Sequence, residues 1–550
     1  MRLPTPSSAV RFFNRCSAVW LLLQVTGVAL AADVPPTPGS VRGLVPAERN
    51  RANNPAQIIL PDQPGQAIHD RRGKRFQVHA FRFVGNTAFT AQRLKRVVER
   101  FVDLELNLYD LNVAADAVTE FYHDRGYNLA RAVIPAQKVE DGAVTIAVVE
   151  GRAGNVLFSG QKRYDATLLR DYMRPLTTGS LVTTDKLERS LLLLNDLPGL
   201  KARATMVPGN EFGASDILVK LEESLFNLNL NVDNAGRKET GRTRADASLD
   251  INNPLGIGDQ LNVRGMATDK RLMRYQKLGY SLPVNHDGLR FTASVSEVRY
   301  DVSGVFAALG LDGLAKNAEV GLLFPLVRSR GRNDTWTIGY RDTQLEQRAF
   351  KTIISSTRFR IATVGYQFNS VEEDSSANNG SIQLASNLKK NSNGLKQDAE
   401  MLRVELDGST LQPLDRQWDV YLRGNLVFSN DRLPDSEKFS IGGPGSVRAY
   451  RASELRGDSG AQGTLEFRRR LTIASRAASL SVFADVGRVI YKAPGFKDAW
   501  DSLTGVGVGL TVYPTQQTTV KLEVATPVAG RFHAADGEKG RVWASISASF

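Results

Sequence analysis

The chain has 550 residues with a formal net charge of +12, and 42% of them are hydrophobic. That content is too apolar for a disordered chain, and beyond the first thirty-odd residues no apolar run approaches the roughly 18–20 residues of a membrane-spanning helix. A helical membrane transporter is therefore excluded, which leaves a soluble multidomain protein or a β-barrel, whose strands are apolar only at alternate residues.

The chain offers little for building a metal or thiol site. Its only cysteine is Cys16, and its histidines are far apart: His69, His79, His123, His286 and His533. Because none of them has a His or Cys neighbour at ligand spacing, we predict no catalytic, cofactor or metal site of that kind; a carboxylate-only cation site stays open. Lysines and arginines are spread along the chain, which does not favour nucleic acid as a partner.

Residues 1–31 have the three parts of a secretory signal peptide. Arginines precede an apolar stretch at residues 18–30, and Ala29-Leu30-Ala31 offers a small-x-small cleavage site. We predict cleavage after Ala31, which would remove Cys16 and leave an exported chain without disulfides.

Residues 32–75 read as a linker because they are rich in proline, with Asn, Arg and Gln between. The prolines leave room for two or three helical turns near residues 47–52. A short helix there stays one alternative and an irregular linker the other.

Residues 76–151 and 152–223 are each predicted to fold as a β-α-α-β-β module. In the first, a strand ends at the turn signal Gly85-Asn86, two helices follow, and the second helix stops at Gly126. The second module repeats this order, with its second helix stopping before Pro198-Gly199. The apolar helix positions are Leu94, Val97, Val98 and Phe101, then Leu111, Ala114, Val118 and Phe121, then Leu168, Leu169, Tyr172 and Met173.

Residues 224–550 are predicted to form an all-β transmembrane barrel. Segments of eight to ten residues alternate strictly between apolar and polar, as in residues 226–233, 520–525 and 542–550. At roughly 20 residues per strand and connection, the region has room for about sixteen antiparallel strands. The terminal Phe550 is expected to serve in membrane insertion.

Several short motifs, in their order and spacing, resemble one family. They are Phe83-Val84-Gly85-Asn86-Thr87, Arg125-Gly126-Tyr127, Ile134-Pro135-Ala136-Gln137, Asp233-Asn234-Ala235-Gly236 and Asn253-Pro254-Leu255-Gly256. Paired β-α-α-β-β modules before a barrel resemble POTRA domains, and the chain is similar to the two-partner secretion transporters (TpsB type) of the Omp85 superfamily. That family is the hemolysin and filamentous haemagglutinin secretion/activation family of Gram-negative outer membranes.

The most specific marker is the loop at residues 441–451, whose Val447-Arg448-Ala449-Tyr450 resembles the tip of the family's sixth extracellular loop. The resemblance implies that this tip folds into the barrel and that Arg448 pairs with the acid of a Phe-x-Asp strand motif, here Phe483-Ala484-Asp485. Alternation turns Asp485 inward, and a contact between Arg448 and Asp485 in the lumen would be charge-assisted and would hold the loop in place. Ala449 stands where the family has glycine, and alanine tolerates fewer backbone conformations.

The resemblance implies an outer-membrane translocator, not an enzyme, that works without a cofactor. Its POTRA domains would recognise an unfolded partner protein (an adhesin, a hemolysin or similar) in the periplasm, and its barrel, surrounded by outer-membrane lipid, would export it. The resemblance also implies an N-terminal helix that plugs the pore; residues 32–75 are long enough for such a helix and a linker, and whether they form it stays open. One barrel with its own lumen can act as a monomer. The alternatives are an assembly factor for other outer-membrane proteins and a passive porin-like channel.

Three motifs suggest other functions but have simpler explanations. Residues 457–460 copy a serine-protease motif without a nearby base, and residues 505–509 resemble a nucleotide loop but continue as a strand. Of the arginines at 468–470, we expect two to face the lumen and one to lie near a membrane interface.

Overall fold

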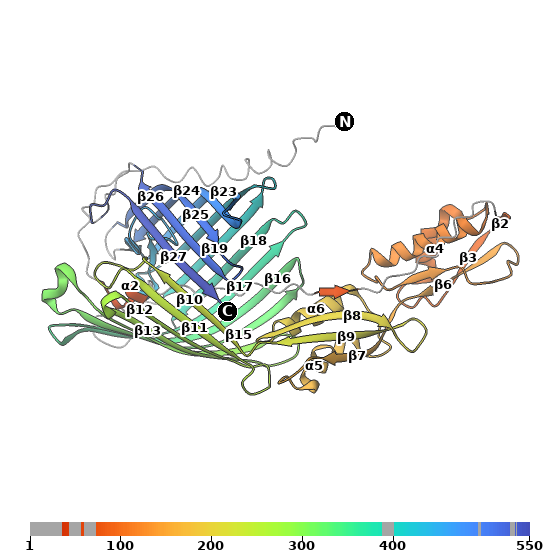
Figure 1. The fold of residues 1–550 in the computed structure, drawn as a ribbon, viewed down its shortest axis with the longest axis horizontal. Helices are drawn as coiled ribbons and strands as arrows, with labels where there is room; N and C mark the ends of the chain where they lie inside the picture. The colour runs from red at the N-terminus through yellow and green to blue at the C-terminus, as the bar shows by residue number, and fades with distance from the viewer. Residues whose placement is uncertain are drawn as a thin grey trace.

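The computed structural model describes residues 36–42, 57–59, 73–387, 401–492, 497–528, 534 and 536–550. The predicted signal peptide and the predicted helix near residues 47–52 lie outside these ranges. The described chain forms two α+β modules followed by a closed antiparallel barrel of sixteen strands, so the predicted fold class is confirmed. Figure 1 shows the first module (orange) farthest from the barrel and the second (yellow) between them.

The first module packs two helices against a small sheet. Its elements are β2 (Phe76–Val78), β3 (Ala80–Val84), α3 (Ala91–Val98), η2 (Glu99–Phe101), β4 (Leu104–Leu106), α4 (Leu108–His123), β5 (Arg131–Val133) and β6 (Ala143–Val149). Asn107 and Asp110 form a capping box that satisfies backbone N–H groups at the start of α4. The predicted apolar face of α4 is buried at Leu111, Ala114 and Val118.

The first strand of this module is divided, which the sequence analysis did not predict. β2 pairs with β4, whereas β3 joins the sheet of order β3-β6-β5. The apolar residues change phase between Ala80 and Phe81, so one continuous strand could not bury both sets on the same face.

The second module has β7 (Arg152–Ser159), α5 (Ala166–Tyr172), η3 (Arg174–Leu176), α6 (Thr184–Asn195), β8 (Leu200–Pro208) and β9 (Ala214–Glu223). Its sheet has the order β1-β8-β9-β7, where β1 (Gln57–Ile59) comes from the predicted linker and pairs in parallel with β8. A strand of three residues gives almost no signal of its own. Its conformation depends on the edge of β8, so the sequence analysis missed it.

Helix α6 lies between this sheet and the barrel, and therefore its run of leucines is buried on both sides. All four residues at positions 191–194 are buried. Leu193 lies close to Gly288 and Pro325 in the barrel. Asp196, which caps α6, holds the Arg328 guanidinium through two hydrogen bonds of 2.7 and 2.8 Å. The second module is thus attached to the barrel by apolar packing and by a bidentate ion pair.

A buried carboxylate fixes the end of the first module that faces the second. Glu150, at the end of β6, accepts hydrogen bonds from the backbone N–H groups of Thr87 and Ala88 and from the Tyr122 hydroxyl at 2.8 Å. Burial raises the pKa of Glu150, but these hydrogen bonds and one from the Thr87 hydroxyl outweigh it, so the pKa lies below its usual range. The motif at residues 83–87 is therefore the loop that Glu150 holds. On the other side of the junction, the Gly126 carbonyl accepts the N–H of Thr184 at the start of α6.

The barrel alternates apolar residues outside with polar residues inside. Its strands are β10 (Phe226–Asp233), β11 (Arg244–Asn252), β12 (Gln260–Thr268), β13 (Met273–Pro283), β14 (Arg290–Asp301), β15 (Asp312–Arg328), β16 (Arg332–Ala349), β17 (Thr352–Val371), β18 (Ala377–Asn387), β19 (Leu402–Pro413), β20 (Trp418–Ser429), β23 (Ser459–Ile473), β24 (Arg476–Tyr491), β25 (Ala499–Tyr513), β26 (Thr518–Pro527) and β27 (Arg541–Ser549). Short helices η4 (Asp269–Arg271) and η5 (Gly304–Leu309) lie in loops at the end away from the modules, the far end. The end beside the modules is called the near end.

No helix in the described ranges is long and apolar enough to span a membrane.

The barrel closes between its first and last strands by a short ladder. β10 and β27 share five backbone pairs, from Asn229–Ser549 to Asp233–Ser545, whereas every other neighbouring pair shares at least eight. At the far end the Asn234 amide extends the ladder, because it donates to the Val542 carbonyl and accepts the Ala544 N–H, both at 2.9 Å. At the near end, the backbones of Phe550 and Leu228 exchange two hydrogen bonds.

Replacing Glu150 by Gln should lower the free energy of unfolding of the modules by about 1–3 kcal/mol at pH 7, because buried N–H groups lose a charged acceptor. The folded-state pKa of Glu150 is lowered, so its contribution is complete above the unfolded value near 4.3 and is lost as pH falls through the folded value. Urea denaturation of the intact protein, followed by the helical circular-dichroism signal, measures both effects.

The matched control is Glu120→Gln, an exposed carboxylate on α4, which should change stability by less than about 0.5 kcal/mol. Equal stability of Glu150→Gln and the wild type at pH 7 would contradict the assigned role. So would a difference that grows as the pH falls.

Candidate functional site

The loop between β20 and β23 folds back into the barrel lumen. This lumen loop, residues 430–458, contains η6 (Asp435–Glu437), β21 (Phe439–Ile441) and β22 (Leu455–Gly457). At its tip, residues 443–450, the second half is buried: Val447, Ala449 and Tyr450 are each at most 1% exposed. They share an apolar cluster with wall residues that include Phe483, Val489 and Leu503. The tip is therefore packed against the inner wall formed by β24 and its neighbours.

Arg448 is the most heavily bonded residue of the tip. Its guanidinium makes a bidentate contact with Asp485, Nε to Oδ2 and Nη2 to Oδ1, both at 2.8 Å. Its Nη1 also donates to Glu466 at 3.0 Å and to Glu523 at 2.8 Å. The ring of Phe483 lies under the guanidinium carbon, 3.2 Å from centroid to Cζ. One side chain thus binds three strands, β23, β24 and β26.

The charges around Arg448 are balanced, which makes its burial tolerable. Arg468 donates to Glu466 at 2.9 Å, and Lys521 contacts Glu523 at 2.8 Å. Three cations therefore meet the three carboxylates in a nearly dry site, where an unpaired charge would be costly. Removing Arg448 would leave Asp485, which is 1% exposed, without its main partner.

The last strand is also fixed by the tip. Trp543 of β27 donates its indole N–H to the Arg448 carbonyl at 2.7 Å. Because β27 forms the short closing ladder with β10, the loop tip supports the strand whose pairing is weakest.

The sequence analysis predicted the contact partners Arg448, Phe483 and Asp485, and the structure brings all three together. It missed Glu466 and Glu523. A usable signal was present, because Glu523 alternates with Leu522 and Val524 and so faces the lumen. What alternation cannot show is the strand shift and the loop path that bring two inward carboxylates to one guanidinium.

Ala449 is accommodated by a glycine in the wall. Its backbone is not in the left-handed region, so alanine at this position causes no strain of that kind. A Cβ on Gly505 of β25 would collide with the Cβ of Ala449. Residues 505–509 resemble a nucleotide loop in sequence. In the structure, the missing side chain of Gly505 leaves the space into which the tip fits.

The base of the lumen loop is held by Asp458, part of the protease-like motif. This carboxylate is 1% exposed, contacts the Lys438 ammonium at 2.8 Å and accepts the backbone N–H groups of Leu433 and Lys492. Its role is to join the loop to the segment after β24. As for the arginine run, Arg468 and Arg470 bind lumen carboxylates, whereas Arg469 lies over Trp418 on the outer face.

A short helix from the predicted linker also lies inside the barrel. α2 (Pro38–Arg42) buries Val41 completely in an apolar cluster on the far-end wall. The hydroxyl of Thr37 donates to Asp435 of the lumen loop and accepts from Arg456 at 3.3 Å. The segment around α2 is therefore bonded to the loop as well as packed against the wall.

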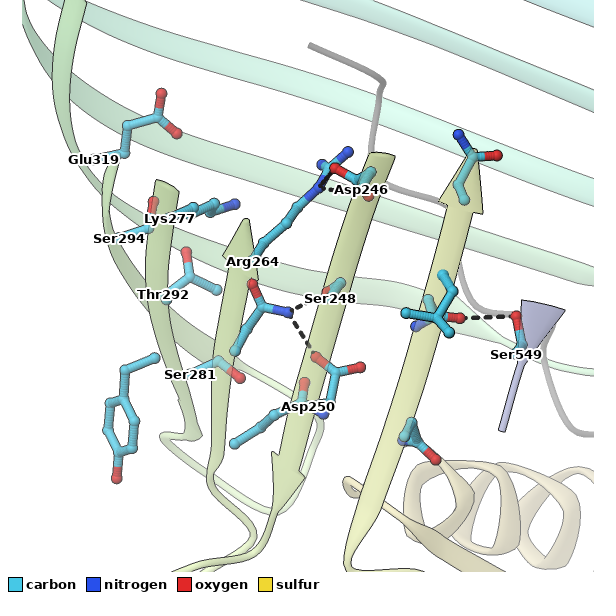
Figure 2. A pocket seen from close by; sticks show the side chains of 18 of the residues that line it. Asp246, Ser248, Asp250, Arg264, Lys277, Ser281, Thr292, Ser294, Glu319 and Ser549 are labelled. Atoms are coloured by element: carbon cyan, nitrogen blue, oxygen red, sulfur yellow. Dashed lines mark hydrogen bonds and ion pairs between the residues drawn. The ribbon is translucent and has the colours of Figure 1, made fainter. Parts of the chain in front are cut away.

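A polar cavity of about 1400 Å³ runs through the lumen from the near end to the loop tip. Residues of the second module, including Asn195 and Lys201, line one end, and Pro444 and Gly445 of the loop tip line another part. Figure 2 shows hydroxyl, amide and charged side chains of β11 to β15 pointing into it, with Asp246 and Arg264 in contact. The cavity leads from the second module to the tip.

Comparisons with known proteins place this architecture. A family model described as haemolysin secretion/activation protein ShlB/FhaC/HecB matches residues 213–512, and one described as POTRA domain, ShlB-type, matches residues 76–151. The heme/hemopexin transporter protein HuxB of Haemophilus influenzae is 25% identical over 488 residues, which cover 84% of this chain and 85% of HuxB. The outer membrane transporter CdiB of Escherichia coli is 24% identical over 427 residues, covering 75% and 72%. The solved structure of CdiB from Escherichia coli has the same fold, with a TM-score of 0.71 at 20% identity over 89% of this chain and 93% of that one.

Substituting Gly505 by Ala should displace the loop tip, because the added methyl collides with Ala449. We expect overpacking to destabilise the barrel by about 1–3 kcal/mol. The double variant Gly505→Ala with Ala449→Gly should recover most of that loss, because it moves the methyl group to the other partner. The temperature at which the folded, compact form disappears on an SDS gel measures barrel stability.

Ala449→Gly alone is the control for the loss of the loop methyl. If the double variant is no more stable than Gly505→Ala, the two residues do not act as a packing pair.

Proposed function

The chain belongs to the ShlB/FhaC/HecB family of haemolysin secretion/activation proteins, and we propose that it exports one unfolded partner protein across the outer membrane. The relatives are named for transport, HuxB for heme/hemopexin and HpmB of Proteus mirabilis for hemolysin. The observation that carries the proposal is the order of the parts along one path. Two periplasmic modules lead into a polar cavity, and the cavity ends at a loop tip held by Arg448.

The cavity suits an extended polypeptide of mixed sequence. Serine, threonine and asparagine side chains line it between charged pairs such as Asp246 and Arg264. Such walls can exchange hydrogen bonds with a passing backbone without holding one side chain tightly. The partner's folding outside the cell would make its return unfavourable and supply the direction.

Recognition would begin at the sheet edges of the modules, because backbone pairing requires little of the partner's sequence. One edge is occupied: β1 covers β8 of the second module. β7 is the last strand on the other side of that sheet among the described residues. A partner that pairs with β8 must displace β1, and β1 follows α2 along the chain, so arrival of the partner and withdrawal of α2 would be linked.

Export requires the lumen loop and α2 to leave the path together. Thr37 bonds to Asp435 and Arg456 of the loop, so the two obstacles share contacts. Arg448 would hold the closed state and, through Trp543, also the closing strand. We expect one protein chain to suffice for this cycle.

The direct test compares proteins released by cells with and without this chain. Loss of one large secreted protein, with other outer-membrane barrels unchanged, supports dedicated export. Depletion of those barrels with an unchanged medium would instead indicate an assembly factor, and no change in either would indicate a channel.

Arg448→Ala and Asp485→Ala should each leave the barrel inserted but sharply reduce secretion. Each removes one partner of a buried pair, which costs about 3–5 kcal/mol at the tip. Secretion falls because the displaced tip no longer supports β27 through Trp543, and the wall of the pore loses its transport-competent form. Secreted and cell-associated partner protein are quantified at matched barrel levels. Arg432→Ala, which removes an exposed cation from the same loop, is the control and should secrete normally. Normal secretion by both tip variants would refute the role of the pair.

A further inference from the structure

The outer face of β13 to β17 changes character abruptly toward the far end. The inward residues of these strands at that level include Tyr275, Val298 and Phe359, which are buried in the lumen cluster. The residues between them in sequence therefore point outward. Nearer the modules those outward residues are apolar and exposed, as at Leu278, Val295, Val320, Ile338 and Val364. This is the lipid-facing band of the barrel.

Immediately beyond that band, the first outward residue is charged on four of the five strands and is a glutamine on the fifth. The first outward residue past the border is Gln276 on β13, Glu297 on β14, Lys316 on β15, Asp342 on β16 and Arg360 on β17. The second is Arg274, Arg299, Leu314, Gln344 and Arg358 in the same strand order. We call these ten positions the basic belt, because they hold five cations and two carboxylates.

The carboxylates of the belt do not neutralise its cations. Glu297 contacts both Arg299 and Lys316, and Asp342 contacts both Arg358 and Arg360. Each acid is thus shared by two cations, whose side chains stay 40–69% exposed.

Two arginines of the belt face each other across neighbouring strands. Arg274 is the register partner of Arg299. Like charges directly opposite each other are unfavourable unless an anion lies between them.

The belt is confined to one side of the barrel. On β19 and β20 the outward residues at the far end are apolar and exposed, as at Leu402 and Phe428. A basic surface at the border of the apolar band, present on some strands and absent from others, indicates a localised anionic ligand at the level of the lipid headgroups.

We propose that the basic belt binds the phosphate groups of an outer-leaflet glycolipid of the lipid A type. The far end is the outer-leaflet end because the modules are periplasmic. Arginine guanidinium groups form bidentate hydrogen bonds with phosphate, and the facing Arg274 and Arg299 are placed to share one phosphate while Arg358 and Arg360 engage another. The site is independent of what the pore exports.

The experiment measures binding of purified lipid A to the full-length protein by native mass spectrometry. The variants are Arg274→Gln with Arg299→Gln, and Arg358→Gln with Arg360→Gln. Each double variant should weaken lipid A binding about tenfold or more, since each removes two charge-assisted donors. Arg469→Gln is the matched control, because Arg469 is an outward cation at the near end of the barrel and should bind lipid A as the wild type does.

Wild-type protein alone supplies a second measurement that needs no variant to fold. Lipid A affinity should fall as ionic strength rises, and lipid A without phosphates should bind at least about tenfold more weakly. Equal binding of the phosphate-free lipid, or an equal loss in Arg469→Gln, would overturn the proposal. Inorganic phosphate that displaces nothing at millimolar concentration supports a lipid headgroup, and phosphate that competes fully would assign the belt to free phosphate instead.

Discussion

The contact of Arg448 with three carboxylates fixes the lumen loop to the inner wall of the barrel. Asp485, Glu466 and Glu523 come from three strands, and the carbonyl of the same arginine holds Trp543 on a fourth. A bidentate pair in a dry site is strong when it is complete and costly when one partner is withdrawn. Partial withdrawal of the tip would already lose this pair, so the seated position of the loop is sharply defined.

Fit at the tip depends on volume as much as on charge. The methyl of Ala449 occupies the space that Gly505 leaves open, so loop and wall together contain one methyl group at this contact. The loop sequence alone shows only that alanine replaces a glycine. The structure shows that a glycine is present on the opposite surface instead, and that the backbone of Ala449 needs no left-handed conformation.

The sequence predicted what depends on local periodicity and failed where distant segments decide. Alternation gave the sixteen strands, and helical spacing gave both modules, because burial on one face imposes those periods. β1 acquires strand structure only from the edge of β8. Likewise, the position of α2 depends on packing against a lumen wall whose residues lie far along the sequence. The inward phase of Glu523 was visible, but its meeting with Arg448 requires the loop path.

The strands β13 to β17 show how alternation lets one sheet serve two environments. Inward residues such as Tyr275 and Tyr300 pack with Val41 of α2, whereas Arg274 and Arg299, their neighbours in sequence, face outward on the same strands. Any shift of register by one residue would exchange these faces and bury the arginines in the apolar cluster. The charged outer belt and the apolar inner cluster therefore fix the same register from opposite sides, so a ligand bound outside would stabilise the wall against which α2 is held.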